Sequence, residues 1–342
     1  MNRGRKSHKS NRLIPVIALL AVIGMGLLGV HFWEQRESQR EAEQYALSEE
    51  EPFVNQKVTL TYQGSEYVLR NDLDTYLLIG LDKFTDTLSD PELFTNNQQA
   101  DFLFLMIVDK TNKSYSALHL NRDAMTEIQR LGMSGKKVGS FTGQLALSHT
   151  FGSGGKDSCR NTAQAVSHYL LDVPVEHYFS VTMDAIPVLN DLVGGVTVYI
   201  DDDFSAVDPA LEQGKTIRLQ GQQALTFIRE RQRVDDGTNL SRMNRQRTYI
   251  NALYEQMGAQ LNADSGFSAR LASRLSDYSV SDLTTTELSN LADRLKDYTF
   301  TGIDTIRGEA VKGEKYMEFY TDSEDLQSVL VRLFCRPGNA LS

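Results

Sequence analysis

A run of 21 residues without Asp, Glu, Lys or Arg, residues 13–33, constrains the fold of this chain more than any other feature. At a rise of 1.5 Å per residue, a helix of this length spans roughly 30 Å, the thickness of a bilayer core. Five Lys or Arg residues precede the run and acidic residues appear only after it, which places the N-terminus in the cytoplasm. A cleaved signal peptide is the alternative, but no small-x-small cleavage site follows the run. We therefore expect a cytoplasmic basic tail (1–12), one transmembrane helix (13–33) and an extracellular remainder in the cell membrane.

The charge of the remainder is strongly acidic. From residue 34 onward, 30 Lys and Arg residues stand against 45 Asp and Glu residues, a net charge of −15. Such a balance argues against a broad nucleic-acid-binding face. Residues 227–247 nevertheless hold six arginines and no lysine. A guanidinium group can bind two oxygens of a phosphate at once and stays charged, so this segment indicates an anionic ligand. A solvated salt-bridge lattice with Glu230, Asp235 and Asp236 is the alternative.

The pattern along the chain predicts an α/β fold of three layers, with a mixed central sheet flanked by helices. Residues 34–56 read as a stalk, and residues 57–74 as a small accessory β-hairpin that turns at Gln63–Gly64. Buried strands are expected at 75–82, 101–109 and 115–123, and helices at 161–175 and 184–196. The catalytic domain would occupy residues 75–260, with a C-terminal part, 261–342, packed on it.

The ends of the three strands carry charged residues. The connection at 110–114 is five residues long, so the second and third strands should be antiparallel. If the first two are antiparallel as well, Asp82 at the end of the first meets Asp101 at the start of the second. Arg122 and Asp123 then close the third strand at the same edge of the sheet. The arginine-rich segment adds Arg229 and Arg231 on one face of an extended stretch and Arg242 and Arg245, three residues apart, on one face of a helix.

Several stretches resemble motifs of the LytR–CpsA–Psr family of cell-wall ligases. They are "IGLD", "QAD" and "LNRDAM", then "LDVPVEHYFSVTMDAIPVLNDLVGGVTVYI" (171–200) and "FIRERQRVDDGTNLSRMNRQ", in that order along the chain. The resemblance implies a phosphotransferase that moves a phosphate-linked glycopolymer, of the teichoic acid or capsular polysaccharide type, from a polyprenyl diphosphate lipid to peptidoglycan with Mg²⁺. Hydrolysis of the lipid diphosphate and non-catalytic binding of the wall or the lipid are the competing interpretations. An extracellular acidic domain excludes transcriptional control through DNA.

The resemblance also assigns roles to individual residues. Asp82 and Asp101 match the carboxylates that hold the metal. The diphosphate-binding and catalytic residues that it implies are Arg122, Arg229, Arg231, Arg242 and Arg245, with Gln246 in the diphosphate site and Asp123 in the catalytic set. Arg233 and Arg247 fall outside the pattern and are expected to be ordinary surface residues.

Three positions depart from the family pattern. Gln99 stands where an arginine is frequent, Phe102 where threonine or serine is usual, and Asn239 where an acidic residue is usual. Because Asn239 cannot accept a proton, any general base must come from Asp235, Asp236, Asp123 or water. Restoring the acid with Asn239→Asp would then leave the rate unchanged or raise it.

Three further features leave alternatives open. Cys159 and Cys335 could form a disulfide on the oxidising side of the membrane, but two distant cysteines do not establish one. The stretch "FGSGGKDS" (151–158) lacks the spacing of a phosphate-binding loop, so it is either a turn near the active site or an ordinary loop. The apolar residues of the helices at 161–171 and 184–193 could line a pocket for the lipid or could belong to the core.

Overall fold

The computed structural model describes residues 59–84, 88–91, 93–231, 233–234, 236–314 and 316–338. The predicted basic tail, transmembrane helix and stalk lie outside these residues. No helix within the described ranges is long and apolar enough to cross a bilayer. All described residues belong to one compact unit, residues 57–342.

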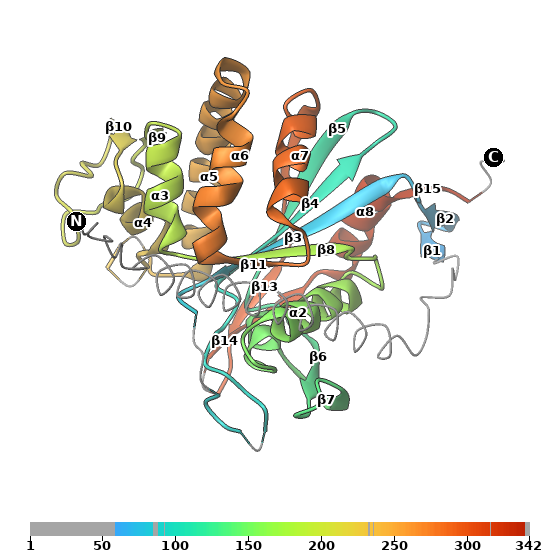
Figure 1. The fold of residues 1–342 in the computed structure, drawn as a ribbon. Helices are drawn as coiled ribbons and strands as arrows, with labels where there is room; N and C mark the ends of the chain where they lie inside the picture. Colours follow the sequence, from blue (N-terminus) through green and yellow to red (C-terminus); the bar gives the residue numbers. More distant parts are fainter. Residues whose placement is uncertain are drawn as a thin grey trace, which may run out of the picture. The chain divides into compact units, whose positions relative to one another are not determined.

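A mixed sheet of six strands forms the centre of this unit (Figure 1). In spatial order its strands are β11 (Ser279–Ser281), β8 (His177–Thr182), β3 (Leu73–Leu81), β4 (Phe102–Asp109), β5 (Ser114–Leu120) and β12 (Thr299–Asp304). The pairs β3–β4 and β4–β5 are antiparallel, whereas β3–β8 and β5–β12 are parallel. The predicted mixed sheet is confirmed, and so is the antiparallel pairing of the second and third predicted strands, β4 and β5. The first and second, whose relation the sequence left open, are antiparallel as well.

The C-terminal part is more deeply integrated than the sequence indicated. It supplies both edge strands of the sheet, β11 and β12, rather than only covering the catalytic domain. It also contributes β15 (Cys335–Pro337), which pairs with β2 (Ser65–Leu69) of the accessory hairpin. The first strand of that hairpin is β1 (Thr59–Tyr62), and its turn uses the left-handed conformation at Gln63 (φ 49°) and Gly64 (φ 76°).

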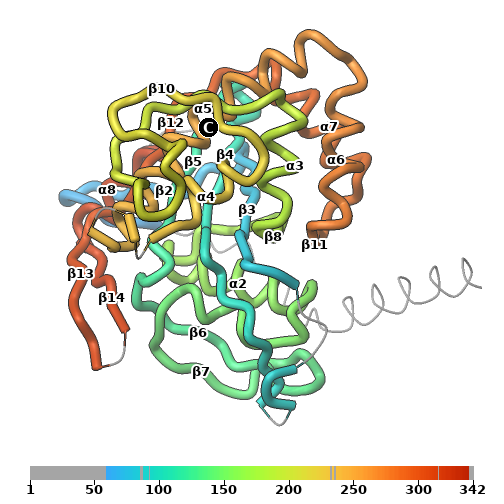
Figure 2. The backbone as a smooth tube through the Cα atoms, turned by 90° about the vertical axis from the view of Figure 1, so that its left-hand side faces the viewer, coloured from blue at the N-terminus to red at the C-terminus, as the bar shows by residue number. Residues whose placement is uncertain are grey.

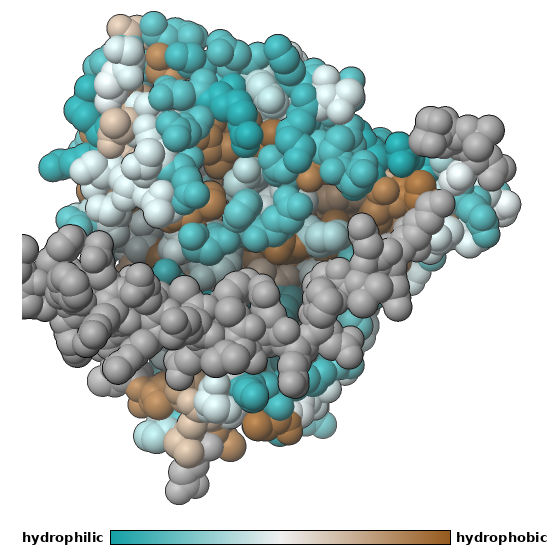
Figure 3. Space-filling view, turned by 45° about the vertical axis from the view of Figure 1, so that its right-hand side comes forward, coloured by the Kyte–Doolittle hydropathy of each residue, from teal (hydrophilic) through white to brown (hydrophobic). Residues whose placement is uncertain are grey.

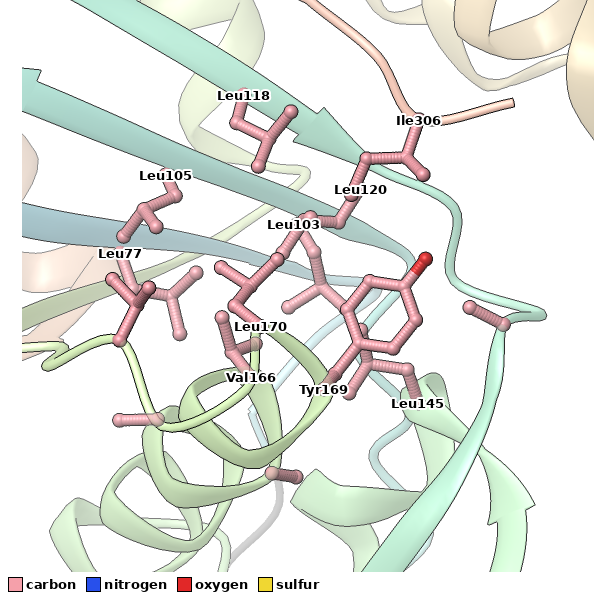
Figure 4. Packing of buried hydrophobic residues seen from close by; sticks show 14 of the residues in the cluster. Leu77, Leu103, Leu105, Leu118, Leu120, Leu145, Val166, Tyr169, Leu170 and Ile306 are labelled. Atoms are coloured by element: carbon pink, nitrogen blue, oxygen red, sulfur yellow. The ribbon is translucent and has the colours of Figure 1, made fainter. Parts of the chain in front are cut away.

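Helices cover both faces of the sheet (Figure 1). On one face, α2 (Lys156–Tyr169) and α8 (Ser323–Phe334) share a hydrophobic core with alternate residues of β3, β4 and β5, as Figure 4 shows for Leu77, Leu103 and Val166. The other face carries α3 (Ala185–Leu192), α5 (Asn239–Ala263), α6 (Phe267–Leu275) and α7 (Thr285–Leu295). A second core lies among α3, α4 (Gln222–Arg229), α5 and α6. Figure 3 shows that the surface on one side of the molecule is mainly hydrophilic, with scattered hydrophobic patches.

The remaining strands form three two-stranded units. They are β6 (Met125–Leu131) with β7 (Lys137–Gln144), β9 (Val196–Tyr199) with β10 (Thr216–Leu219), and β13 (Gly308–Lys312) with β14 (Met317–Thr321). Short 3₁₀ helices occur at η1 (Leu145–Thr150) and η2 (Ser276–Tyr278). In Figures 1 and 2 the hairpins β6–β7 and β13–β14 both project below the central sheet, and β14 lies beside the start of β6.

The fold bears on all three features that the sequence left open. Cys159, buried in α2, and Cys335 are both free thiols. The glycine-rich loop leads into α2, and in the first turn of that helix the Asp157 carboxylate accepts hydrogen bonds from Ser153 N (2.8 Å) and from Ser158 N (2.9 Å). The apolar residues Ala163, Val166 and Leu170 of the first predicted helix belong to the core.

Candidate active site

The antiparallel pairing of β3 and β4 brings two of the predicted acids to one edge of the sheet. The ladder ends at the pair Gly80–Phe102, and Asp101 N donates to Gly80 O at 2.8 Å. Asp82 follows Gly80 by two residues, and Asp101 directly precedes Phe102. The end of the third strand reaches the same edge, because Arg122 Nη1 donates to Asp101 Oδ1. The convergence expected from the loop lengths is therefore present.

Arg122 is held by three oxygen-bearing side chains. Besides Asp101, its guanidinium donates from Nη2 to Gln99 Oε1, and its Nε forms an ion pair of 3.8 Å with Asp123 Oδ1. Gln99 thus accepts a hydrogen bond from Arg122 at a position where a second arginine would repel it. The Nε of Arg122 is buried and has no hydrogen-bond partner within the described part of the chain.

Arg242 approaches Asp101 from α5 and is buried, with 6% of its surface exposed. Its Nη1 lies 3.8 Å from Asp101 Oδ1, and its Nη2 donates to Asp101 O (3.3 Å) and to Asn239 Oδ1 (2.9 Å). Burial lowers the pKa of Arg242 to about 10, although the Asp101 charge acts in the opposite direction. Its Nε is also buried without a partner among the described residues. Two guanidinium groups therefore share one carboxylate, and each keeps an unused N–H donor.

Arg229 and Arg231 lie nearer the solvent. Arg229 is the last residue of α4, and its Nη2 forms an ion pair of 2.6 Å with Asp82 Oδ1, both side chains being about half exposed. The Arg231 side chain makes no hydrogen bond or ion pair with a described residue. Its positive charge acts on the pKa values of Asp123 and Arg242, in the direction of lower values, so it contributes to the field of this cluster. Four of the predicted arginines, Arg122, Arg229, Arg231 and Arg242, thus surround the two strand ends.

Asp123 is the most buried carboxylate of the cluster, with 8% of its surface exposed. Burial raises its pKa, while the positive charges of Arg122, Arg242 and Arg231 act in the opposite direction. Gln144 Nε2 donates to its Oδ1 at 3.1 Å. A carboxylate with a raised pKa beside several cations is suited to accept a proton during catalysis.

Arg245 has a different environment, although it lies three residues from Arg242 on the same helix. Its guanidinium donates to Asp202 Oδ2 (2.6 Å), Phe227 O (3.2 Å) and Glu230 O. It lines a pocket of about 120 Å³ with Tyr199, Asp201, Asp202, Phe227, Ser241, Asn244 and Thr248. Arg245 therefore joins α5 to the segment that carries Arg229, and it does not contact Asp101. The role in diphosphate binding that the resemblance implies for Arg245 and for buried Gln246 stays a prediction.

Asn239 occupies the position at which the family usually has an acid. Its Nδ2 donates to Asn121 Oδ1 at 2.9 Å, and its Oδ1 accepts from Arg242. The same Asn121 oxygen accepts from Asp123 N at 3.0 Å. Because a carboxylate could not donate to Asn121, the amide at position 239 fits this network better than an acid would.

Sequence reasoning identified Gln99 and Asn239 only as departures and missed Asn121 and Gln144 altogether. Asn121 directly precedes Arg122 and could have been considered, whereas nothing in the sequence distinguishes Gln144. The two expected surface arginines also differ. Arg233 is exposed and pairs with Glu230 at 3.0 Å, while burial lowers the pKa of Arg247. Among the described residues, Arg233 is the one arginine whose side chain pairs with an acid of the salt-bridge alternative, Glu230.

The two strand-end acids are suited to a metal that arrives with its substrate. Within the described ranges, no group of three or more His, Cys, Asp or Glu side chains could hold a metal ion. Asp82 and Asp101 each use Oδ1 in an ion pair, and neither Oδ2 makes a hydrogen bond to a described residue. Mg²⁺ is commonly bound by one or two carboxylates together with substrate phosphate oxygens and water, so this pair fits Mg²⁺.

Comparison with known proteins places this geometry in context. TagU from Halalkalibacterium halodurans, a polyisoprenyl-teichoic acid–peptidoglycan teichoic acid transferase, is 29% identical over 180 residues, which are 53% of this chain and 52% of TagU. The chain thus spans about half the length of that relative. Enterococcus faecalis TagU is 24% identical over 325 residues, 93% of this chain and 91% of the relative. Bacillus subtilis TagV, with the same type of name, is 25% identical over 318 residues, 88% of this chain and 71% of the relative.

Solved structures show the same fold. The crystal structure of B. subtilis TagV has a TM-score of 0.57 at 24% identity and covers 78% of this chain and 97% of TagV. Protein gbs0355 from Streptococcus agalactiae has a TM-score of 0.60 at 19% identity, over 77% of this chain and 86% of that protein. The family described as "LytR_cpsA_psr family" matches residues 30–332. Since this match covers most of the sequence, the chain belongs to the LytR–CpsA–Psr family.

Proposed function

We propose that this protein is a phosphotransferase that moves a phosphate-linked glycopolymer of the teichoic acid type from a polyprenyl diphosphate lipid to peptidoglycan. The observation that carries the proposal is the pair Arg122 and Arg242, which share Asp101 and each keep a buried Nε without a hydrogen-bond acceptor among the described residues. Buried N–H donors without acceptors are rare in folded proteins, and an anionic ligand would satisfy them. The names of the relatives TagU and TagV support the choice of donor and acceptor.

The proposed reaction is a single displacement at phosphorus. A hydroxyl oxygen of peptidoglycan attacks the phosphorus atom that carries the glycopolymer, and its proton passes to the Asp123 carboxylate. The bond from this phosphorus to the bridging oxygen breaks, and polyprenyl phosphate leaves. Arg122 and Arg242 stabilise the negative charge on the non-bridging oxygens, while Arg229 and Arg231 lie where they can neutralise the leaving group.

Mg²⁺ belongs to this proposal, with Asp82 and Asp101 as its protein ligands. Bound there, Mg²⁺ would act as a Lewis acid on the phosphate oxygens. Asp101 then has two tasks, because the same carboxylate orients Arg122 and Arg242. Asp82, which is half exposed and paired with Arg229, can exchange that partner when a substrate binds.

Apolar residues beside Arg242 offer a place for the first part of the prenyl chain. The ring of His119 packs against Phe102 (4.9 Å between centroids) and Phe104 (5.9 Å), and burial lowers the pKa of His119 to about 3, so this imidazole is neutral. Phe102 directly follows Asp101, the carboxylate that pairs with Arg242. Phe102, one of the departures from the family pattern, therefore adds apolar surface next to the diphosphate site. We further propose that residues 13–33 anchor the enzyme in the cell membrane, where such a lipid resides.

The direct test uses the full-length protein in detergent with a synthetic polyprenyl diphosphate-linked polymer and a peptidoglycan oligomer. Transfer predicts a covalent polymer–peptidoglycan product and one polyprenyl phosphate per product. Release of free polymer without an acceptor would identify a hydrolase instead. Donor binding without any turnover would identify a binding module.

A further inference from the structure

The hairpin β13–β14 exposes an unusual amount of apolar and aromatic surface. Val311 is 40% exposed, Met317 46%, Tyr320 50% and Tyr316 68%, so this one hairpin holds four of the eleven large hydrophobic residues that are exposed in the described part of the chain. All five residues of β13 are exposed. Concentrated exposure of this kind usually marks a binding surface.

This hairpin is attached directly to the candidate active site. Phe319 N donates to Asp123 O at 2.9 Å, and an isolated parallel bridge joins Phe319 to Ala124. Gln144 Nε2 donates both to Asp123 Oδ1 (3.1 Å) and to Met317 O (2.7 Å). The strand β14 of the hairpin therefore lies beside the start of β6, next to Asp123.

Strand geometry shows which residues of the hairpin share a face. Phe319 of β14 is buried, with 3% of its surface exposed, so it points into the core. Because successive side chains of a strand alternate between faces, Glu318 and Tyr320 point to the opposite face. Val311 joins them, because the register of the hairpin pairs it with Glu318. We call Val311, Glu318 and Tyr320 the hairpin face; the Asp123 carboxylate lies beside the hairpin, because Gln144 Nε2 bonds to both Asp123 Oδ1 and Met317 O.

The chemistry of the hairpin face selects its ligand. Residues 308–321 carry three glutamates and two lysines, a net charge of −1, which disfavours an anionic bilayer surface or a second diphosphate. The Tyr320 hydroxyl donates to Glu318 Oε2 at 2.7 Å. A sugar ring presents apolar C–H groups on its faces and hydroxyl donors on its rim. An aromatic ring beside a carboxylate complements both features.

We propose that the hairpin face binds the sugar chain of the peptidoglycan acceptor and delivers its hydroxyl group to Asp123. This inference rests on the proposed function, because it assigns the acceptor of that same reaction. The inference also explains why a C-terminal hairpin, far from the arginine-rich segment in sequence, is fixed to the catalytic acid. One hydrogen bond joins them directly, from Phe319 N to Asp123 O, and two more run through Gln144 Nε2.

The test measures binding of peptidoglycan glycan oligomers, freed of their stem peptides, to the full-length protein by isothermal titration calorimetry. Tyr320→Ala should raise the Kd about tenfold, the loss typical of a central aromatic contact. Tyr320→Phe keeps the ring and should recover most of the affinity, which separates binding from misfolding. Tyr199→Ala is the matched control, because Tyr199 lies on β9 and is 51% exposed, against 50% for Tyr320.

Three outcomes would overturn the assignment: equal Kd values for Tyr320→Ala and the native protein, equal losses at Tyr199 and Tyr320, or binding of free stem peptides in place of the glycan. Donor turnover is measured on the same samples. A native protein that binds glycan through Tyr320 but consumes no donor would contradict the proposed function while supporting the hairpin as a glycan-binding surface.

Discussion

The two ends of the β3–β4 ladder carry similar residues but differ in how their charges are matched. At the end where Leu73 pairs with Asp109, Arg70 donates to both oxygens of Asp72 (3.0 and 2.8 Å) and lies 2.7 Å from Asp109. Lys110 pairs with Asp74 at 2.6 Å. At the end where Gly80 pairs with Phe102, the four arginines of the candidate active site meet three carboxylates among the described residues, those of Asp82, Asp101 and Asp123.

The ionisation of the acids follows this difference. The hydrogen bond from Arg70 lowers the pKa of Asp72, whereas burial raises the pKa of Asp123 despite its three cationic neighbours. One end is a completed salt-bridge network that stabilises the sheet. At the other end the arginines outnumber the described carboxylates, and two buried N–H groups have no hydrogen-bond acceptors among the described residues. Two groups of Asp and Arg residues at the ends of the same strands can therefore be distinguished as structural and ligand-binding.

The largest effect is expected at Asp123. Asp123→Asn removes the proposed proton acceptor with little change of shape, so turnover should fall by about 10²–10⁴. The carboxylate accepts a proton only when ionised, so activity should be lost as the pH falls through its pKa. Because burial raises that pKa, the acid limb of the kcat/KM profile should lie at a higher pH than for an ordinary aspartate. The pH dependence of kcat/KM of the native protein checks the position of the acid limb, and the turnover of Asp123→Asn checks the loss of rate. A native rate in Asp123→Asn would exclude Asp123 as the proton acceptor.

The next largest losses of turnover are expected at the two buried arginines, Arg122 and Arg242. Arg122→Ala or Arg242→Ala removes a donor to the transition state and should lower donor turnover by about 10²–10³. Lysine keeps the charge but loses the planar fork, so Arg→Lys at either position should also impair turnover. Full activity in the lysine variants would show that Arg122 and Arg242 act only through their positive charge, without specific hydrogen bonds to the substrate.

Asn239→Asp is expected to have a smaller effect, in the direction opposite to the sequence-based expectation. The new carboxylate would face the Asn121 oxygen without a hydrogen to donate, and turning Asn121 over would break its bond to Asp123 N. It would also hold Arg242 in an ion pair. We expect turnover to fall about five- to tenfold, equivalent to roughly 1–1.4 kcal/mol for one lost hydrogen bond. A rate at or above the native value would restore the original expectation.

Arg70→Ala tests the completed end of the ladder. Removing Arg70 leaves Asp72 and Asp109 without their partner and should lower the free energy of unfolding by about 1–3 kcal/mol. Since Arg70 lies at the end of the strands away from Asp101, turnover of the folded variant should match the native value. Thermal unfolding and donor turnover, measured side by side, check this separation of stability from activity.

Arg233→Ala should have the smallest effect. Its guanidinium is exposed and pairs with Glu230, and an exposed pair of this kind contributes about 0–1 kcal/mol. Neither the melting temperature nor the donor turnover should change measurably. A loss of turnover comparable with that of Arg242→Ala would mean that exposed arginines of the segment also serve the reaction.

The sequence predicted the parts of this structure that depend on local rules. Strand patterns and a five-residue loop were sufficient to bring Asp101 and Arg122 to one edge. The place of Asp82 depended on the pairing of β3 with β4, which the 18-residue connection between them left open. The spacing of Arg242 and Arg245 correctly indicated a helix, but it could not show that the two guanidinium groups have different partners, because this depends on where Asp101 and Asp202 lie in space. The hairpin β13–β14 reaches Asp123 across nearly 200 residues of sequence, a contact that no local pattern encodes.

The central claim is that the Asp101 end of the ladder, and not the Asp72 end, is a site for a lipid diphosphate. Titration calorimetry with a short-chain polyprenyl diphosphate, with and without Mg²⁺, tests it directly on the native protein, Arg242→Ala and Arg70→Ala. The account predicts equal affinity for the native protein and Arg70→Ala, a loss of at least tenfold for Arg242→Ala, and tighter binding to the native protein with Mg²⁺. Equal affinity in all three proteins would contradict it.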